Sequence, residues 1–454
     1  MQTIKSKRVD IKLAKFAVET RYSDIPEDMV VFMKHVTLKG IANIVAGGSL
    51  PASRKLGALM RDRRSPGDVG VIGYGFRTSL WDAVFLHGFF AHAAELEDDA
   101  FSDADGGFSG PSWTITTIPL LLSLSEKLRL SGNDFILALA VGLEVHRRTC
   151  LSTIWHRGLM LGPGAIGPAV AASKALGLNL DQTRSAMGLA QSAPFVQFTN
   201  YGTDGHFVES ALQSLQGIMA AEMAKQGLTG NPDLIGYLSP LLGEEMVNAK
   251  AMVAGLGRRW LARDFWLKKY PCSFGAHCSI DILLELRKQH DLSYEEVETI
   301  ETSARLDKPE PKNAEEAQVS IQHILGAAMR DGDFNLSHFT DVAFADPAYK
   351  QARSKVRIVL DANRAGLLSG QPDRVVIRMK DGREFAGERA YPIGSYKDRL
   401  TEDQVRDLYR KFTAGVLTAK HIEKTAEMVL NLEKLNDTEE LMDILTFRHR
   451  TATS

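Results

Sequence analysis

Apolar residues recur at helical spacing through most of the first 265 residues of the chain. The clearest helix start is Ser23-Asp24 ahead of Ile25-Pro26-Glu27, because a polar capping residue followed by proline is typical of a first turn. This helix is expected to end at Gly47-Gly48. Helices with the same spacing are expected at 80–95, 115–130, 132–150, 164–176, 180–192 and 208–227. The pattern predicts a large all-α domain.

The pattern changes near Tyr270, where short segments rich in β-branched residues begin. Lys380-Asp381-Gly382-Arg383 predicts a hairpin turn, because Asp-Gly favours the tight turns that join antiparallel strands. A helix is expected over 314–330. Strands are expected at 297–303, 355–360, 374–380 and 384–388.

Amphipathic helices return from Glu402 onward, so the simplest chain path has one domain inserted into another. The sequence predicts a mainly α fold in which residues 1–268 and 400–454 form an all-α helical domain. Residues 269–399 are expected to form an inserted, smaller α+β lid domain.

Composition narrows the class of protein. A chain of 454 residues with 44% hydrophobic and 24% charged residues is typical of a two-domain globular protein. A net charge of −2 without a basic stripe excludes nucleic acid as an expected partner. We find no apolar leader and no uncharged apolar run of about 18 residues, so a cytoplasmic protein without a membrane partner is expected. The three cysteines, Cys150, Cys272 and Cys278, are expected to be free thiols in a reducing compartment.

The sharpest change in polarity lies at residues 87–107, where an apolar helix pattern runs into an acidic stretch. Carboxylates that crowd together at the end of a buried helix have raised pKa values, and they can transfer protons or bind a cation. A solvated acidic loop is the alternative, because most charge runs lie in solvent. The acidic residues are Glu95, Glu97, Asp98, Asp99, Asp103 and Asp105.

Three further polar clusters interrupt small or apolar surroundings. No cluster has the ligand spacing of a zinc or calcium site, and no glycine-rich loop follows a strand, so the spacing predicts no zinc, calcium or dinucleotide site. The clusters are Trp155-His156-Arg157-Gly158, Thr203-Asp204-Gly205-His206, and Lys268-Lys269-Tyr270-Pro271-Cys272 with His277.

Seven motifs in order along nearly the whole chain resemble the MmgE/PrpD family, which includes 2-methylcitrate dehydratase, cis-aconitate decarboxylase and iminodisuccinate epimerase. They are Arg21-Tyr-Ser-Asp-Ile-Pro26, residues 88–99, Gly142-Leu-Glu-Val, Gly177-Leu178, residues 206–230, Lys268-Lys-Tyr-Pro271 with His277, and Ser320-Ile-Gln-His-Ile324 ahead of Asp331-Gly332. The resemblance implies a helical domain with a lid, an active site in the cleft between them, and a homodimer. It also implies a reaction that needs no metal or cofactor. This reaction begins with a proton transfer at the carbon next to a carboxylate.

The resemblance also implies roles for single residues. The first acid of the family's acidic run falls on Glu95, and a histidine of a glycine-rich turn corresponds to His156. The tyrosine that points into the cleft from the lid falls on His323. The expected catalytic residues are therefore Glu95, Asp98, His156 and His323. The expected substrate-binding residues are Asp99, Thr203, His206, Lys268 and His277.

Several family positions differ in this chain. A threonine becomes Asp99, a lysine becomes Thr203, and a histidine before Pro-Ser becomes Gly110. These changes remove positive charge where relatives hold a di- or tricarboxylate, which suggests a less anionic substrate or one that carries an amine. His156 as a core histidine, and Lys268 and His277 as residues that brace the hinge, are the alternatives to functional roles.

The sequence thus predicts a cofactor-independent lyase or isomerase that acts on a small carboxylic acid, with hydration or dehydration as the leading reaction. Epimerisation or decarboxylation on the same scaffold is the first alternative. A catalytically degraded relative that only binds its ligand is the second. The expected partners are a small-molecule carboxylate and a second copy of the chain.

Overall fold

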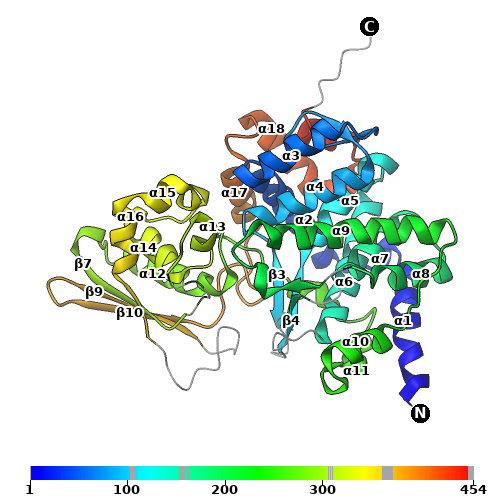
Figure 1. Ribbon diagram of the computed structural model, residues 1–454, viewed down its shortest axis with the longest axis horizontal. Coiled ribbons are helices and arrows are strands. Elements are labelled where there is room, and N and C mark those ends of the chain that lie inside the picture. The colour runs from blue at the N-terminus through cyan, green and yellow to red at the C-terminus, as the bar shows by residue number, and fades with distance from the viewer. Residues whose placement is uncertain are drawn as a thin grey trace, which may run out of the picture. The chain divides into compact units, whose positions relative to one another are not determined.

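The computed structural model describes residues 2–102, 108–152, 159–161, 164–193, 195–304, 306, 308, 310–359 and 372–447 (Figure 1). Their contacts divide into two compact units. The helical unit comprises Met1–Ala93, Glu97–Phe265 and Thr401–Ser454. The sheet unit comprises Ala94–Leu96 and Trp266–Leu400.

Helices form most of the helical unit, which confirms the prediction of a mainly α fold. The expected helices are present with ends displaced by a few residues, because caps and turns set where a helix starts and stops. The helices are α1 (Gln2–Glu19), α2 (Glu27–Gly48), α3 (Pro51–Arg63), α4 (Leu80–Ala93), α5 (Ile118–Leu128), α6 (Gly132–Thr149), α7 (Ile166–Ala175), α8 (Leu180–Ala190), α9 (Asp204–Lys225), α10 (Leu234–Leu242), α11 (Ala249–Val253), α17 (Glu402–Thr413), α18 (Ala419–Leu430) and α19 (Glu439–Leu445).

Short strands correct the prediction that this unit is all α. Three antiparallel pairs occur in its described part: β1 (Val69–Gly70) with β2 (Arg77–Thr78), β3 (Asp99–Ser102) with β4 (Phe108–Trp113), and β5 (Leu159–Leu161) with β6 (Val196–Gln197). The second pair includes the end of the acidic run, with Asp99 opposite Trp113. The polarity pattern missed it because the strand is short and its charges predict a loop.

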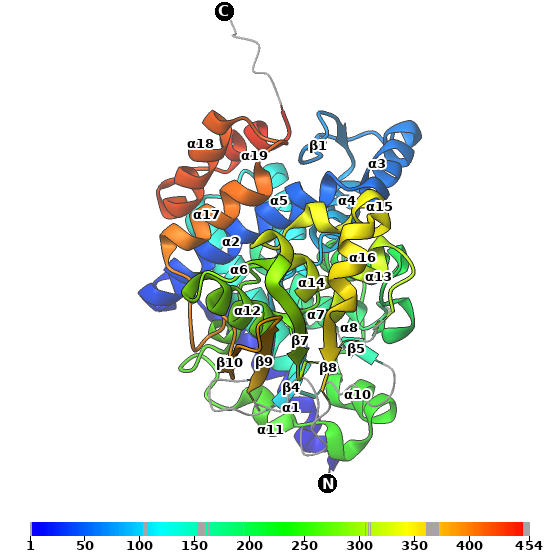
Figure 2. The same cartoon turned by 90° about the vertical axis from the view of Figure 1, so that its left-hand side faces the viewer.

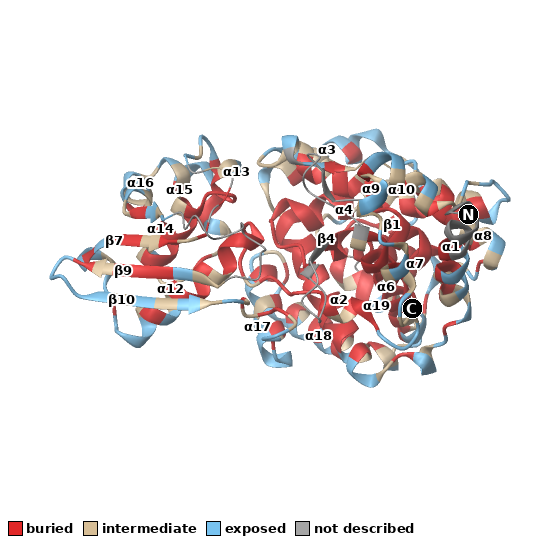
Figure 3. Ribbon diagram, turned by 90° about the horizontal axis from the view of Figure 1, so that it is seen from below, coloured by how far each residue is buried: buried red, intermediate tan, exposed pale blue. Residues whose placement is uncertain are grey.

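Helix α2 lies at the centre of the helical unit, and every residue from Phe32 to Gly48 is buried (Figure 3). Its length and apolar composition would also suit a membrane-crossing helix, but 78% of its apolar window is buried inside the protein, as in the core helix of a globular domain. Helix α4 packs against α2, and α9 packs against α4. A Cβ atom on Gly88 of α4 would lie 2.9 Å from the Cα atom of Ala211 on α9, so only glycine permits this approach.

The sheet unit contains a four-stranded sheet in the order β10-β9-β7-β8, whose strands lie side by side in Figure 2. The β7–β8 pair is parallel and the other pairs are antiparallel. Helix α12 packs on β9 and β10, and α14 packs on β8. The strands are β7 (Val297–Thr302), β8 (Val356–Ile358), β9 (Asp373–Met379) and β10 (Glu384–Arg389), and the helices are α12 (His277–Gln289), α13 (Ala314–Ala317), α14 (Ile321–Asp331), α15 (Asp341–Ala345) and α16 (Pro347–Ser354).

The single helix expected over 314–330 is two helices, because Ser320 adopts an extended backbone and caps the start of α14. The apolar core of the sheet unit lies between α12, α14 and one face of the sheet, and includes Leu283, Ile324 and Ile377. All three cysteines are free thiols, as expected. Burial raises the pKa of the Cys278 thiol, which makes it a poor nucleophile.

Candidate active site

The first part of the acidic run is buried. Glu95, Glu97, Asp98 and Asp99 are each at most 5% exposed, so the alternative of a solvated loop is wrong for these residues. Asp103 and Asp105 lie outside the described residues. Ionised carboxylates removed from water need a nearby cation or hydrogen-bond donors, so their partners define the site.

Asp98 forms an ion pair with Lys39 from the middle of α2. The Lys39 Nζ atom lies 3.4 Å from the Asp98 Oδ1 atom, and both side chains are fully buried. Lys39 also donates a hydrogen bond to the Asn43 Oδ1 atom at 2.7 Å. The charge of Asp98 is therefore offset by a cation that lies 59 positions earlier in the chain.

Asp99 closes the β3–β4 hairpin. Its Oδ1 atom accepts hydrogen bonds from the Ala100 backbone N–H at 2.7 Å and the Ser112 backbone N–H at 3.0 Å. Its Oδ2 atom accepts from the Trp113 indole Nε1–H at 2.9 Å. These three donors hold the carboxylate and fix the position of the indole ring.

Two buried histidines lie next to this indole. His92 comes from the last turn of α4 and His206 from the first turn of α9, and their ring centroids are 4.4 Å apart. The Trp113 ring lies 4.7 Å from the His92 ring and 5.7 Å from the His206 ring. We call His92 and His206 the histidine pair. Phe207 and Tyr201 also pack against it.

A carboxylate lies near each histidine. The His92 Nε2 atom is 3.9 Å from the Glu97 Oε2 atom, and the His206 Nδ1 atom is 3.9 Å from the Glu209 Oε2 atom. The Ser210 hydroxyl donates to the Phe207 carbonyl, so it accepts a hydrogen bond from the His92 Nδ1–H at 3.0 Å. The His92 Nε2 atom is then the nitrogen that can take up a proton, and Glu97 would stabilise the imidazolium.

Helix α6 adds a neutral histidine and a buried cation. The Trp113 backbone N–H donates to the His146 Nε2 atom at 3.1 Å. Burial, together with the adjacent Arg147 charge, lowers the pKa of His146 to about 3, so this ring is neutral at physiological pH. Arg147 itself is fully buried. Arg147 and Lys39 correct the sequence-based expectation that this part of the protein lacks cations.

The predicted residue Thr203 does not join this cluster. Thr203 is exposed, and its hydroxyl donates to the Asn200 carbonyl at 2.7 Å just before α9 begins. His156 lies outside the described residues.

In the sheet unit, Glu95 contacts Lys268. The buried Lys268 Nζ atom donates to the Glu95 carbonyl at 3.1 Å and lies 3.8 Å from the Glu95 Oε2 atom. Glu95 has a φ angle of 51°, a left-handed conformation that favours glycine at a helix C-terminus. A strained backbone that carries a buried carboxylate is typical of a functional position.

His277 and His323 each lie in the interior of the sheet unit. The His277 ring stacks on Phe274, with centroids 5.0 Å apart. The His323 Nε2–H donates to the His338 carbonyl at 2.8 Å, and the His323 Nδ1 atom accepts from the Arg353 guanidinium at 3.0 Å. Both ring nitrogens of His323 thus have partners within the unit, and its catalytic role stays a prediction.

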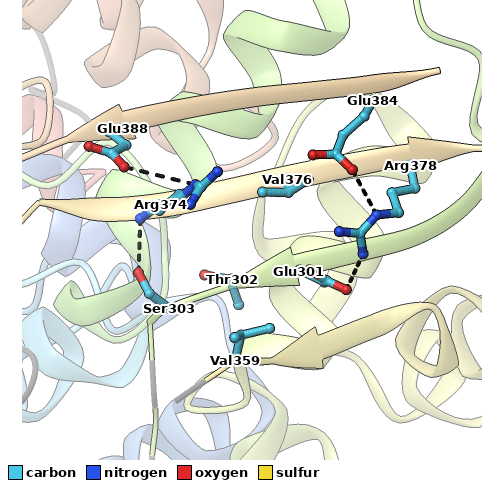
Figure 4. Close-up of a pocket in the computed structure, with 9 residues that line it drawn as sticks. All are labelled: Glu301, Thr302, Ser303, Val359, Arg374, Val376, Arg378, Glu384 and Glu388. Carbon is cyan, nitrogen blue, oxygen red and sulfur yellow. Dashed lines mark hydrogen bonds and ion pairs between the residues drawn. The ribbon is translucent and has the colours of Figure 1, made fainter. Parts of the chain in front are cut away.

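A pocket of about 430 Å³ lies on the sheet face away from α12 (Figure 4). Its arginines are paired with carboxylates. Arg374 lies 3.8 Å from Glu388, and Arg378 lies 2.8 Å from Glu384 and also pairs with Glu301. These pairs neutralise both arginines, so the described part of this pocket offers a carboxylate ligand no free cation.

Comparison with known families agrees with the motifs. The MmgE/PrpD N-terminal domain matches residues 11–237, and the MmgE/PrpD C-terminal domain matches residues 270–434. The chain belongs to the MmgE/PrpD family. The resemblance inferred from the sequence is therefore confirmed.

The relatives of this MmgE/PrpD chain include decarboxylases. It is 26% identical to the cis-aconitate decarboxylase-like protein oryM of Aspergillus oryzae, over 96% of this chain and 97% of the relative. It is 25% identical to cis-aconitate decarboxylase of Aspergillus terreus, over 96% of each chain. The cis-aconitate decarboxylase of Homo sapiens is also 25% identical, over 80% of this chain and 79% of the relative.

Sequence reasoning missed several residues of this MmgE/PrpD site. His92 lies inside the apolar pattern that predicts a helix over 80–95, and Lys39 and Arg147 lie far from the acidic run in the sequence. The available signal was the presence of charged residues within otherwise apolar helix patterns, since a buried charge needs a partner.

The left-handed backbone of Glu95 gives a stability prediction. We expect Glu95→Gly to be more stable than Glu95→Gln by about 1 kcal/mol, because only glycine adopts this conformation without strain. Both variants lose the carboxylate, so the difference between them does not depend on its charge. Urea unfolding measures the difference, and equal stabilities would contradict it. A catalytic Glu95 carboxylate would lower the activity of both variants alike.

His323 gives a pH prediction. Burial lowers its pKa from 6.5 to about 4, so between these values the unfolded chain binds more protons and stability falls as the pH falls. Between pH 7 and pH 5 this loss is about 2 kcal/mol. We expect His323→Gln to unfold with a correspondingly weaker pH dependence and to keep its kcat. An unchanged pH dependence with a large loss of kcat would instead assign His323 to catalysis.

Proposed function

We propose that this protein is a lyase of a small carboxylic acid that works by proton transfer at the carbon next to a carboxylate. The observation that carries the proposal is the buried histidine pair, with Glu97 and Glu209 beside it, in a member of the MmgE/PrpD family. Relatives named as cis-aconitate decarboxylases support an enzyme of this kind.

In the proposed mechanism the His92 Nε2 atom removes a proton from the substrate, and Glu97 stabilises the resulting imidazolium. His206, next to Glu209, supplies a proton in the later step. Two adjacent imidazoles suit this exchange because an imidazole can both accept and donate a proton. We retain Glu95 and Asp98 as proposed proton-exchanging carboxylates and Asp99, Lys268 and His277 as proposed substrate contacts.

We propose dehydration as the leading reaction. The C–H electrons form a C=C bond, the C–O bond breaks, and the leaving hydroxyl takes a proton from His206 and departs as water. Decarboxylation is the second candidate and is favoured by the printed names of the relatives. In that case a C–C bond breaks, CO₂ leaves, and the carbon takes the proton instead.

The buried cations bear on the choice of substrate. Loss of family cations at Thr203 and Gly110 favoured a less anionic substrate, but Lys39 and Arg147 place positive charge in the same unit. The substrates to be tested therefore include di- and tricarboxylates as well as less anionic acids. We also propose that the enzyme is a cytoplasmic homodimer that needs no metal or cofactor, as the family resemblance implies.

Deuterium exchange tests the proposed function. The purified chain is incubated in D₂O with 2-methylcitrate, cis-aconitate, and smaller hydroxy and amino acids, with and without EDTA. We expect proton NMR to show loss of a C–H signal next to a carboxylate in at least one acid, unaffected by EDTA. Water loss or CO₂ release then separates dehydration from decarboxylation. No exchange with any acid would favour a protein that only binds its ligand.

Variants of the histidine pair test the mechanism. We expect His92→Gln and His206→Gln each to lower kcat by about 100-fold or more, the range of general acid–base catalysis. His87→Gln is the matched control, since His87 is buried on the same helix but accepts from the Ile72 backbone N–H and contacts Ser123. It should lower the melting temperature without lowering kcat. Full activity in both His92→Gln and His206→Gln would refute the assignment.

A further inference from the structure

A cavity in the helical unit lies at the C-terminal end of α2. Its volume is about 300 Å³, and no member of the histidine pair or the acidic run lines it. Most of its wall is apolar, and one side chain is cationic. The lining side chains that matter are Val45, Arg54, Ile72, Tyr74, Val416 and Phe447.

The aromatic wall of the cavity is held in place by its own contacts. The Tyr74 hydroxyl donates to the Gly48 carbonyl at 2.7 Å, and the Tyr74 ring stacks on Phe90 with centroids 4.9 Å apart. A Cβ atom on Gly57 would lie 2.3 Å from the Tyr74 ring, so glycine allows the ring to pack against α3. A wall fixed in this way is typical of a preformed small-molecule site.

Among the described residues that line the cavity, Arg54 is the one cation and none is a carboxylate. Among the described residues, the Arg54 side chain makes no hydrogen bond or ion pair. Its surroundings are also basic, because α3 and its C-cap carry Arg54, Lys55, Arg61, Arg63 and Arg64 against a single Asp62. This differs from the sheet pocket, where Arg374 and Arg378 are neutralised by glutamates.

We propose that this cavity binds a small organic anion with an apolar body. The anionic group, a carboxylate or a phosphate monoester, lies on the Arg54 guanidinium, where a charge-assisted hydrogen bond forms. The apolar body packs against Ile72, Val416 and Phe447, which removes its surface from water. Binding here does not depend on the proposed lyase activity.

Calorimetric titration of the full chain with hexanoate tests the proposal. Hexyl phosphate is the second anionic probe, and hexan-1-ol is the neutral match of the same length. We expect hexanoate or hexyl phosphate to bind with a dissociation constant on the order of 1 mM or below, and hexan-1-ol to bind at least about tenfold more weakly.

Two variants assign the binding to this cavity. Arg54→Gln should weaken binding of the anion by about tenfold, the effect expected for one charge-assisted hydrogen bond. Lys55→Gln is the matched control, because it removes the same charge from the next exposed residue of α3, which does not line the cavity. Val416→Trp, which fills the cavity, should abolish binding.

The His206→Gln variant separates this cavity from the candidate active site, since it should leave the Arg54-dependent binding unchanged. The proposal is overturned if no anion binds, if hexan-1-ol binds as tightly as hexanoate, or if Arg54→Gln and Lys55→Gln have the same effect.

Discussion

The burial of an acidic run away from water constrains how the elements of the helical unit pack. Glu97, Asp98 and Asp99 follow the end of α4 directly and are buried. A buried ionised carboxylate is tolerated only with a cation or several donors in contact. Asp98 has Lys39 of α2, and Asp99 has two backbone N–H groups and the Trp113 indole. Each of these partners then constrains another element.

Trp113 shows how one such constraint extends to the candidate site. Its indole N–H is held by Asp99, and its backbone N–H is held by His146 of α6. The ring is therefore fixed where it packs against both members of the histidine pair. Because glycine at position 88 lets α4 approach α9, His92 and His206 come from two helices and still lie in ring contact. The geometry of the proposed proton transfer thus depends on the same contacts that allow the acids to be buried.

Much of the fold could be predicted from the sequence because its signals are local. Helical periodicity located α2, α4 and α9, and the Asp-Gly turn located the β9–β10 hairpin. The break at Ser320 and the β3–β4 pair were missed, because a cap and a short charged strand look like a continuing helix and a loop. The candidate site was predictable only in part. Asp98 and His206 could be identified from the sequence. Lys39 of α2 and His92 of α4 became apparent only from the packing that brings them to Asp98 and His206.

The partners of the arginines show why an arginine alone does not indicate an anion-binding site. Arg378 is paired with glutamates on neighbouring strands, so its charge stabilises the sheet. Arg353 donates to His323 and so helps to keep that ring neutral. Arg54 has a cavity wall on one side and no partner among the described residues. A guanidinium without a partner retains its capacity to bind an anion, and this is why the smaller cavity, rather than the larger sheet pocket, is the one expected to hold a ligand.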